Sequence, residues 1–600
     1  MSIHRAVWAA AGGCLVLSPP LARSQPVDPQ SVVVTAARLP QALATVPQDL
    51  RVIDRSQIER AGATGLGELL QRLAGAEFAA SGGPGQPSAL FLRGSNANHV
   101  VLLVDGVRVN SATAGTNALE HLPLAQIDRI EVLLGPASGL YGADAIGGVI
   151  QVFTRQDPGV QAQLGLGSER TREASAHVGG RDGGTRWSLQ GGWRDTQGIS
   201  ATNADNAYAY NPDLDPYRNA NVGANVEHDW AAGQTLALRA SVSDSRTHFD
   251  SGPDSDDFND QQLTLLALES RNRLGERWSS TLRLARGSDD SRAHGAYPSR
   301  FRTDQDQLSW QNDVRPGVGE LAAGLEWRRE RVDADTDFRQ TERTVASAFG
   351  SYALTLGAQQ WQAALRHDHN SQFGGRDTGN LGWQMTLAPG LSIRAAGGTA
   401  FKAPSFNDLY YPLQYGYQGN PDLRPERSRS VEGGLRWVHG TASLQATVFD
   451  NRIDDLIAIN DDFSTVENIA RARIQGLTLA TRWTQGAWSA RAEATWQDPR
   501  DEDRGAQLAR RAKRFGSAGV DWAAGRWRLG AEWVGAGPRP DAGVVLGGYG
   551  LITLSAGWTL RPGWTLSARL DNAADKAYTL VQGYNTEGRR VLFTLAFDGT

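Results

Sequence analysis

The chain of 600 residues is poor in three residue types. It has one cysteine, Cys14, two methionines and only three lysines beside 57 arginines. A single cysteine excludes an intrachain disulfide and a cysteine-based metal site. The formal net charge of −5 is small for this length, and it argues against a nucleic-acid partner bound mainly through its phosphates.

Long hydrophobic runs are missing from most of the chain. Beyond residue 24 no stretch of 18 apolar residues occurs, and the mean hydropathy is −0.40, which excludes a membrane protein built from helices. The first 24 residues do contain an apolar run from Ala6 to Leu17, followed by a small-x-small site that ends at Ser24. This pattern predicts a secretory signal peptide over residues 1–24. A lipoprotein anchored at Cys14 stays an alternative, although the apolar run continues past that cysteine.

Enzyme motifs are missing as well. The glycine-rich stretch GLYGADAIGG (139–148) lacks the Lys-Ser/Thr ending of a phosphate-binding loop. The ten histidines form no HExxH motif, and no GxSxG motif is present. The sequence therefore predicts no enzymatic activity.

Tryptophan divides the chain into two regions. Apart from Trp8, all of the 18 tryptophans lie between Trp187 and Trp564. The tryptophan-free region up to residue 157 mixes one helix-like pattern with several short aliphatic strands, so we expect a small α+β domain over residues 40–157. The turn-forming residues Asp157-Pro158-Gly159 mark its junction with the second region.

The second region, residues 158–600, has the two-residue period of membrane-spanning strands. In WSARAEATW (488–496), small residues lie between two tryptophans on one face and polar residues lie on the other; RWSLQGGWR (186–194) and WRLGAEW (527–533) repeat the pattern. Trp488 and Trp496 are separated by roughly 27 Å along a strand, or roughly 20 Å of height when tilted, which suits the two aromatic girdles of an outer-membrane barrel. A soluble propeller would show a sequence repeat of about 40 to 50 residues, and none is visible.

The length of this region predicts the number of strands. Residues 158 to 597 number 440, which gives 22 antiparallel strands of about 20 residues each, turns included. The lumen of so large a barrel has to be plugged. We therefore expect an all-β transmembrane barrel with the N-terminal α+β domain inside it. A barrel lipase that uses serine and histidine stays an alternative, although such barrels lack an N-terminal plug.

Motifs spread over nearly the whole chain resemble the TonB-dependent outer-membrane receptor family. The resemblance is carried by 90–110 (LFLRGSNANHVVLLVDGVRVN), 127–154, 401–410 (FKAPSFNDLY), 419–437 and 570–597. Within residues 30–39, a further segment is similar to the family's Ton box: Val32, Val33, Val34, Thr35 and Ala36. One departure is that the chain ends FDGT, three residues past the terminal aromatic Phe597.

The resemblance implies a monomeric importer in the Gram-negative outer membrane, driven by TonB and its inner-membrane complex. A short β-prone segment can add as an edge strand to a sheet of TonB; an ordinary strand of the plug sheet stays the alternative for this segment. The subgroup most similar in 82–110 and 370–377 is that of the cobalamin (vitamin B12) receptors. A siderophore or haem receptor, and a passive porin, remain as other functions.

Acidic loops suggest calcium. Carboxylates clustered on loops suit Ca²⁺, which accepts six to eight oxygen ligands, and calcium in cobalamin receptors orders the extracellular loops. The resemblance carries the ligands over to Asp213, Asp215, Asp250 and Asp260. A further aspartate of the family falls on Ser200 here, with Asp205 as a substitute. Solvated acidic loops without an ion remain the alternative.

Cobalamin is large and polar, so its site needs loop backbone and amide groups. The resemblance places the ligand-contacting plug loops at four residues: Gln86, Ser88, Ala114 and Gly115. The alternative is that these are turn residues chosen for backbone shape. We also expect Arg93 and Arg129 of the plug to pair with Glu426 and Glu432 of the barrel wall, as buried pairs that fix orientation.

Overall fold

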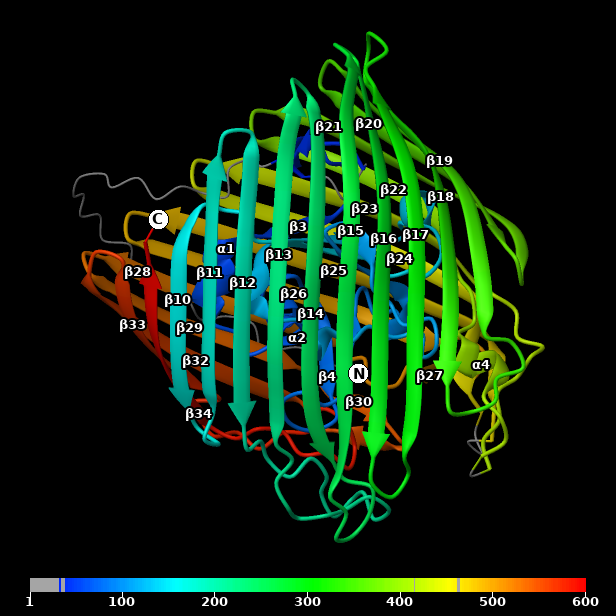
Figure 1. The fold of residues 1–600 in the computed structure, drawn as a ribbon, viewed down its shortest axis with the longest axis vertical. Coiled ribbons are helices and arrows are strands. Elements are labelled where there is room, and N and C mark those ends of the chain that lie inside the picture. The colour runs from blue at the N-terminus through cyan, green and yellow to red at the C-terminus, as the bar shows by residue number, and fades with distance from the viewer. Residues whose placement is uncertain (1–31, 34–37, 415, 461–463, 600) are drawn as a thin grey trace, which may run out of the picture.

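The computed structural model describes residues 32–33, 38–414, 416–460 and 464–599. The predicted signal peptide and three Ton box residues, Val34, Thr35 and Ala36, lie outside the described residues. Figure 1 shows a tall closed barrel that surrounds a smaller N-terminal domain, drawn in blue. In the described part of the chain no helix is long and apolar enough to cross a membrane.

The barrel has 22 spanning antiparallel strands, as the sequence predicts. Each pairs with its neighbour in the chain, and the last strand pairs with the first, with Leu164 opposite Leu595, so that no edge is left open. In Figure 1 the red β34 lies beside the cyan β10 at this seam. The strands are β10 (Gly159–Gly167), β11 (Arg172–Asp182), β12 (Thr185–Thr196), β13 (Tyr217–Ala231), β14 (Gln234–Phe249), β15 (Asp257–Gly275), β16 (Trp278–His294), β17 (Ser299–Val314), β18 (Glu320–Ala334), β19 (Glu342–Leu356), β20 (Gln359–Asn370), β21 (Gly374–Ala388), β22 (Leu391–Lys402), β23 (Glu426–His439), β24 (Ala442–Ile459), β25 (Val466–Gln485), β26 (Trp488–Asp501), β28 (Arg514–Ala524), β29 (Trp527–Ala536), β32 (Tyr549–Arg561), β33 (Trp564–Asp571) and β34 (Arg590–Asp598).

The two ends of the barrel differ in their connections. One end has tight two-residue turns such as 183–184 and 486–487. The other end has long loops over 197–216, 403–425 and 572–589. Short turns face the periplasm and long loops face outside in barrels of this kind. The loops carry β27 (Ala506–Gln507), β30 (Arg539–Asp541), β31 (Val544–Leu546) and α4 (Phe406–Tyr410).

Alternation along each strand separates the lipid face from the lumen. Trp488 and Trp496 keep 49% and 43% of their surface exposed, and leucines on neighbouring strands point the same way. Charged and amide side chains of the intervening positions face the plug. The predicted aromatic girdles are therefore on the outer surface of the barrel.

The plug is a small α+β domain, as predicted. Its central sheet has the strand order β3-β8-β9-β6-β7, with β6 and β9 parallel and β3 at an edge. Two hairpins, β1–β2 and β4–β5, stand apart from this sheet. The elements are β1 (Val32–Val33), β2 (Gln41–Ala42), β3 (Leu50–Ile53), α1 (Arg55–Ala61), α2 (Leu66–Leu73), β4 (Glu77–Ala80), β5 (Ser88–Phe91), β6 (Val100–Val104), β7 (Val107–Arg108), β8 (Ile127–Leu134), α3 (Ser138–Tyr141) and β9 (Gly148–Thr154).

Local sequence explains the two longer plug helices. Asp54 caps α1 by accepting a hydrogen bond from the backbone N–H of Gln57, and Gly62 ends the helix at φ 54°, a conformation that favours glycine. In α2 the leucines recur with helical spacing and pack into the plug core beside Ile130 and Ile150. Both helices thus have one face on the sheet and the other toward the barrel wall.

Candidate functional site

Three of the predicted calcium ligands come together on the extracellular loops. Asp213 and Asp215 lie on the loop between β12 and β13, Asp250 follows β14, and one carboxylate oxygen from each lies within 4.8 Å of the others. Ala201 N donates to Asp215 at 2.6 Å, and Thr202 N donates to Asp250 at 3.0 Å. We call Asp213, Asp215 and Asp250 the acidic cluster.

The carboxylates of the acidic cluster disfavour one another's charged form. Burial raises the pKa of Asp215 to about 7, and the charges of Asp250 and Asp213 act in the same direction, against the hydrogen bond from Ala201. The pKa of Asp213 is also raised, by burial and then by Asp250. In the part of the chain that the structure describes, Asp250 Oδ1 is buried and receives no hydrogen bond. Three close carboxylates with an unsatisfied oxygen suit a hard cation such as Ca²⁺.

The fourth predicted ligand, Asp260, lies elsewhere. It sits on β15 opposite Arg246, whose Nε and Nη2 donate to its two oxygens at 2.7 and 2.8 Å. Ser200 is not a carboxylate substitute either: its hydroxyl lies 3.0 Å from the carbonyl oxygens of Thr202 and Asn211 and shares its single proton between them. The geometry therefore brings together three of the four aspartates.

The predicted ligand-contacting residues of the plug lie at its extracellular end, but they differ in exposure. Gln86 is buried and donates to the carbonyl of His248 at 2.6 Å, whereas Ser88 donates to Glu120 at 2.7 Å. Ala114 is exposed. Gly115 has φ 72°, and a β-carbon there would lie 3.3 Å from Ser405, so the loop before α4 covers this turn.

The acidic cluster and the plug apex are neighbours. Ala201, which donates to Asp215, lies so close to Gly82 that a β-carbon on this glycine would be 2.9 Å from its side chain. Gly82 and Gln86 belong to the same turn between β4 and β5. A cation held by the cluster would therefore order the loops directly above this turn of the plug.

At the other end, the start of the described chain is tied down. Val32 and Val33 pair antiparallel with Ala42 and Gln41, and the Val33 side chain is fully buried. The resting segment is thus a strand of the plug as far as it is described.

Arg38 anchors this segment to the barrel wall. Its Nη1 donates to Glu326 on β18 at 2.5 Å, and its guanidinium lies over the rings of Tyr141 and Phe349 at 4.6 and 4.4 Å. Gln311 also donates to the Arg38 carbonyl at 2.9 Å. We call the contacts of Arg38 with Glu326, Tyr141 and Phe349 the Arg38 latch.

One of the expected plug-to-wall pairs is confirmed and the others are wrong. Arg93 lies 2.5 Å from Asp49, which is fully buried, and 3.6 Å from Glu432, whose side chain is 9% exposed. Arg129 instead lies 3.1 Å from Glu131 of the plug's own sheet, and Glu426 pairs with His99.

The buried charges around Asp49 are balanced. Burial alone would raise the pKa of Asp49, but Arg51, Arg394 and Arg93 hold it well below its usual range. The carboxylate therefore stays charged, and it joins the plug to Arg394 of the wall.

Comparison with known proteins identifies the chain. The model of the TonB-dependent receptor plug domain matches residues 42–149, and that of the TonB-dependent receptor-like β-barrel matches residues 163–573. The chain belongs to the TonB-dependent receptor family. Members of this family are outer-membrane receptors of Gram-negative bacteria that interact with TonB and transport ligands, and they are not known as enzymes.

Proteins similar to this TonB-dependent receptor include a vitamin B12 transporter and two siderophore receptors. The vitamin B12 transporter BtuB of Photobacterium profundum is 28% identical over 583 residues, which cover 94% of this chain and 95% of the relative. The siderophore receptor PirA of Acinetobacter baumannii superposes with a TM-score of 0.80 at 17% identity, over 94% of this chain and 100% of the other. The ferric enterobactin receptor PfeA of Pseudomonas aeruginosa gives 0.78 at 18% identity, over 95% and 100%. At such low identity the two structural matches support the fold alone.

Sequence reasoning missed the Arg38 latch. Arg38 lies just after the Ton box, which is a local signal, but Glu326 is one of many acidic residues on lumen-facing positions of the strands. Only the placement of the plug inside the barrel shows which of them Arg38 meets.

Proposed function

We propose that this receptor imports cobalamin or a related corrinoid across the outer membrane, as a monomer, with Ca²⁺ bound by the acidic cluster. The observation that carries the proposal is the resemblance to a vitamin B12 transporter along 94% of the chain, combined with three clustered aspartates above the plug. Corrinoids are rich in amides, which suit the loop backbone at the extracellular end of the plug.

The competing ligands are ferric chelates and haem. Structural neighbours that bind siderophores share only the fold at the identities found.

Calorimetric titration of the purified protein tests this proposal. We expect saturable binding of cyanocobalamin that is tighter with calcium than with a chelator, and no saturable binding of ferric enterobactin or haem. Binding of an iron chelate without binding of cyanocobalamin would replace the corrinoid by that ligand.

A second test separates active import from a passive porin. Val34→Pro removes a backbone N–H that strand addition to TonB requires, so we expect it to abolish uptake while ligand binding is unchanged. Val34→Ala keeps the N–H and is the matched control. Full uptake by the proline variant would support the porin.

A further inference from the structure

A large cavity lies on one side of the plug. Its volume is about 870 Å³, and it separates α1 and α2 from the inner face of the strands around the seam. The lining extends from Gly563 in a periplasmic turn to Gln86 and Glu587 at the extracellular end. The cavity therefore follows most of the height of the barrel.

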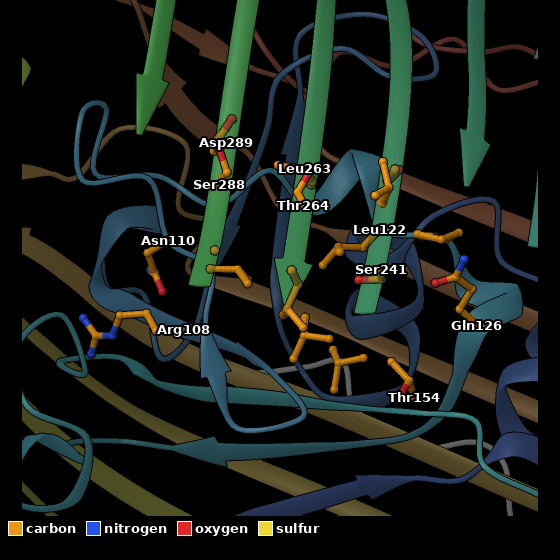
Figure 2. A pocket seen from close by; sticks show the side chains of 18 of the residues that line it. Arg108, Asn110, Leu122, Gln126, Thr154, Ser241, Leu263, Thr264, Ser288 and Asp289 are labelled. Carbon is orange, nitrogen blue, oxygen red and sulfur yellow. The ribbon is translucent and has the colours of Figure 1, made fainter. Parts of the chain in front are cut away.

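Short side chains help to leave this space open. Five of the six seam strands present a small or short polar residue to the cavity: Ser175, Gly192, Ser555, Ser567 and Thr594. On other strands long side chains bridge the gap, since Gln307 donates to the Arg108 carbonyl at 2.9 Å and Gln384 donates to the Ala44 carbonyl at 2.8 Å. The interface beside β14 to β17 retains only a smaller cavity of about 60 Å³ (Figure 2).

One group of charges joins α2 to the seam side of the wall. Arg72 Nη1 lies 3.0 Å from Glu532 on β29, and Arg72 Nη2 lies 3.3 Å from Asp571 on β33. Glu68, one turn earlier on α2, contacts Arg72 and lies 3.1 Å from Arg569. These five residues all line the cavity, and we call them the Arg72 cluster.

We propose that the transported ligand crosses the barrel through this seam-side cavity, and that the Arg72 cluster is the gate that keeps α2 against the wall. The inference deepens the transport function proposed above by naming the path of a hydrophilic ligand. Serine, threonine and glutamine on the wall offer such a ligand hydrogen bonds in place of water.

The order of elements makes this gate accessible to a pull on the N-terminus. From Arg38 the chain passes through β2 and β3 and then directly into α1 and α2. β3 is an edge strand joined to β8 by four residue pairs. Force on the tether therefore reaches the gate helices once the Arg38 latch, the Asp49 contact with Arg394 and this short edge strand are separated.

Ion conductance of the purified receptor in planar bilayers tests the gate without any ligand. Arg72→Met removes the contacts of α2 with Glu532 and Asp571, although Glu532 keeps Arg491 and Asp571 keeps Arg569. Because both wall carboxylates stay paired, the cost is below that of stranding a buried charge, and we expect open events to increase by about 10-fold. Arg108→Met is the matched control, because Arg108 is a buried plug arginine whose ion pair, with Asp144, is inside the plug. If Arg72→Met fails to assemble, the double variant Glu532→Gln with Asp571→Asn replaces it.

A second substitution locates the path. Ser567→Trp fills the cavity and is expected to suppress the leak of Arg72→Met, whereas Leu566→Trp, on the lipid face of the same strand, should leave the leak unchanged. The inference would be overturned if Arg72→Met conducted no more than the unchanged receptor, or if Ser567→Trp did not reduce the leak of Arg72→Met. Since the readout is salt conductance, these outcomes are independent of whether the ligand is cobalamin. In an uptake assay, Ser567→Trp alone should lose transport while ligand binding is unchanged.

Discussion

Replacing Arg38 by alanine should release the N-terminal segment without any ligand. The variant loses a hydrogen bond to a charged group, which contributes about 1.5–3 kcal/mol, and two cation–π contacts of about 0.5–1 kcal/mol each. Arg38 and Glu326 keep 14% and 21% of their side-chain surface exposed, so solvent screening lowers the sum to about 2–4 kcal/mol. At 1.4 kcal/mol per factor of ten, the released fraction rises about 30- to 700-fold.

Thiol labelling measures this fraction. Cys14 is the chain's only cysteine and lies in the predicted signal peptide, so Val33→Cys supplies a unique thiol, at a side chain that is fully buried in the resting state. When opening and closing are fast relative to labelling, the maleimide reaction rate is proportional to the open population. We expect the rate in Val33→Cys with Arg38→Ala to exceed the rate in Val33→Cys alone by the same 30- to 700-fold factor.

The control is Arg339→Ala, which removes an exposed arginine from an extracellular loop and should leave the rate unchanged. An equal rate with and without Arg38 would show that the latch does not hold the segment. A rise of the same size in the control would show that charge loss in general, and not the latch, loosens the protein.

Four further outcomes follow from the charges. Asp215→Asn should weaken calcium binding, measured by calorimetry, whereas Asp260→Asn should not, because Asp260 is occupied by Arg246. Calcium affinity should fall as the pH drops below about 7, since the proton on Asp215 then competes with the cation. Without calcium, the folded state holds that proton to higher pH than the unfolded state, whose carboxyl titrates near 3.8. The free energy of unfolding should therefore decrease as the pH rises from about 4 to 7. A melting temperature that increases with pH over this range would contradict the assignment. Arg93→Ala should destabilise the plug by about 3 kcal/mol, the low end for a buried pair that loses one partner, because Glu432 loses its arginine while Asp49 keeps Arg51 and Arg394. Arg129→Ala, whose side chain is 31% exposed, should cost less, as judged by antibiotic sensitivity of cells carrying each variant.

The sequence by itself determined the architecture. Between Trp488 and Trp496, small residues on one face and polar residues on the other predict a membrane-spanning barrel strand. The absence of tryptophan between Trp8 and Trp187 separates the plug from the barrel. Hydrophobic period and residue count are local quantities, so both domains and the 22 strands could be predicted without knowing any contact.

Contacts between distant residues were decided only by the tertiary structure. Asp250 and Asp260 look equivalent in the sequence, but the register of β14 and β15 places Arg246 opposite Asp260 and leaves Asp250 to meet Asp213 and Asp215. Likewise the rotation of the plug inside the barrel, which no local pattern encodes, selects Glu326 for Arg38 and Glu532 for Arg72. Charge pairing across two separately folded surfaces depends on how those surfaces dock, and that is a property of the assembled domain pair.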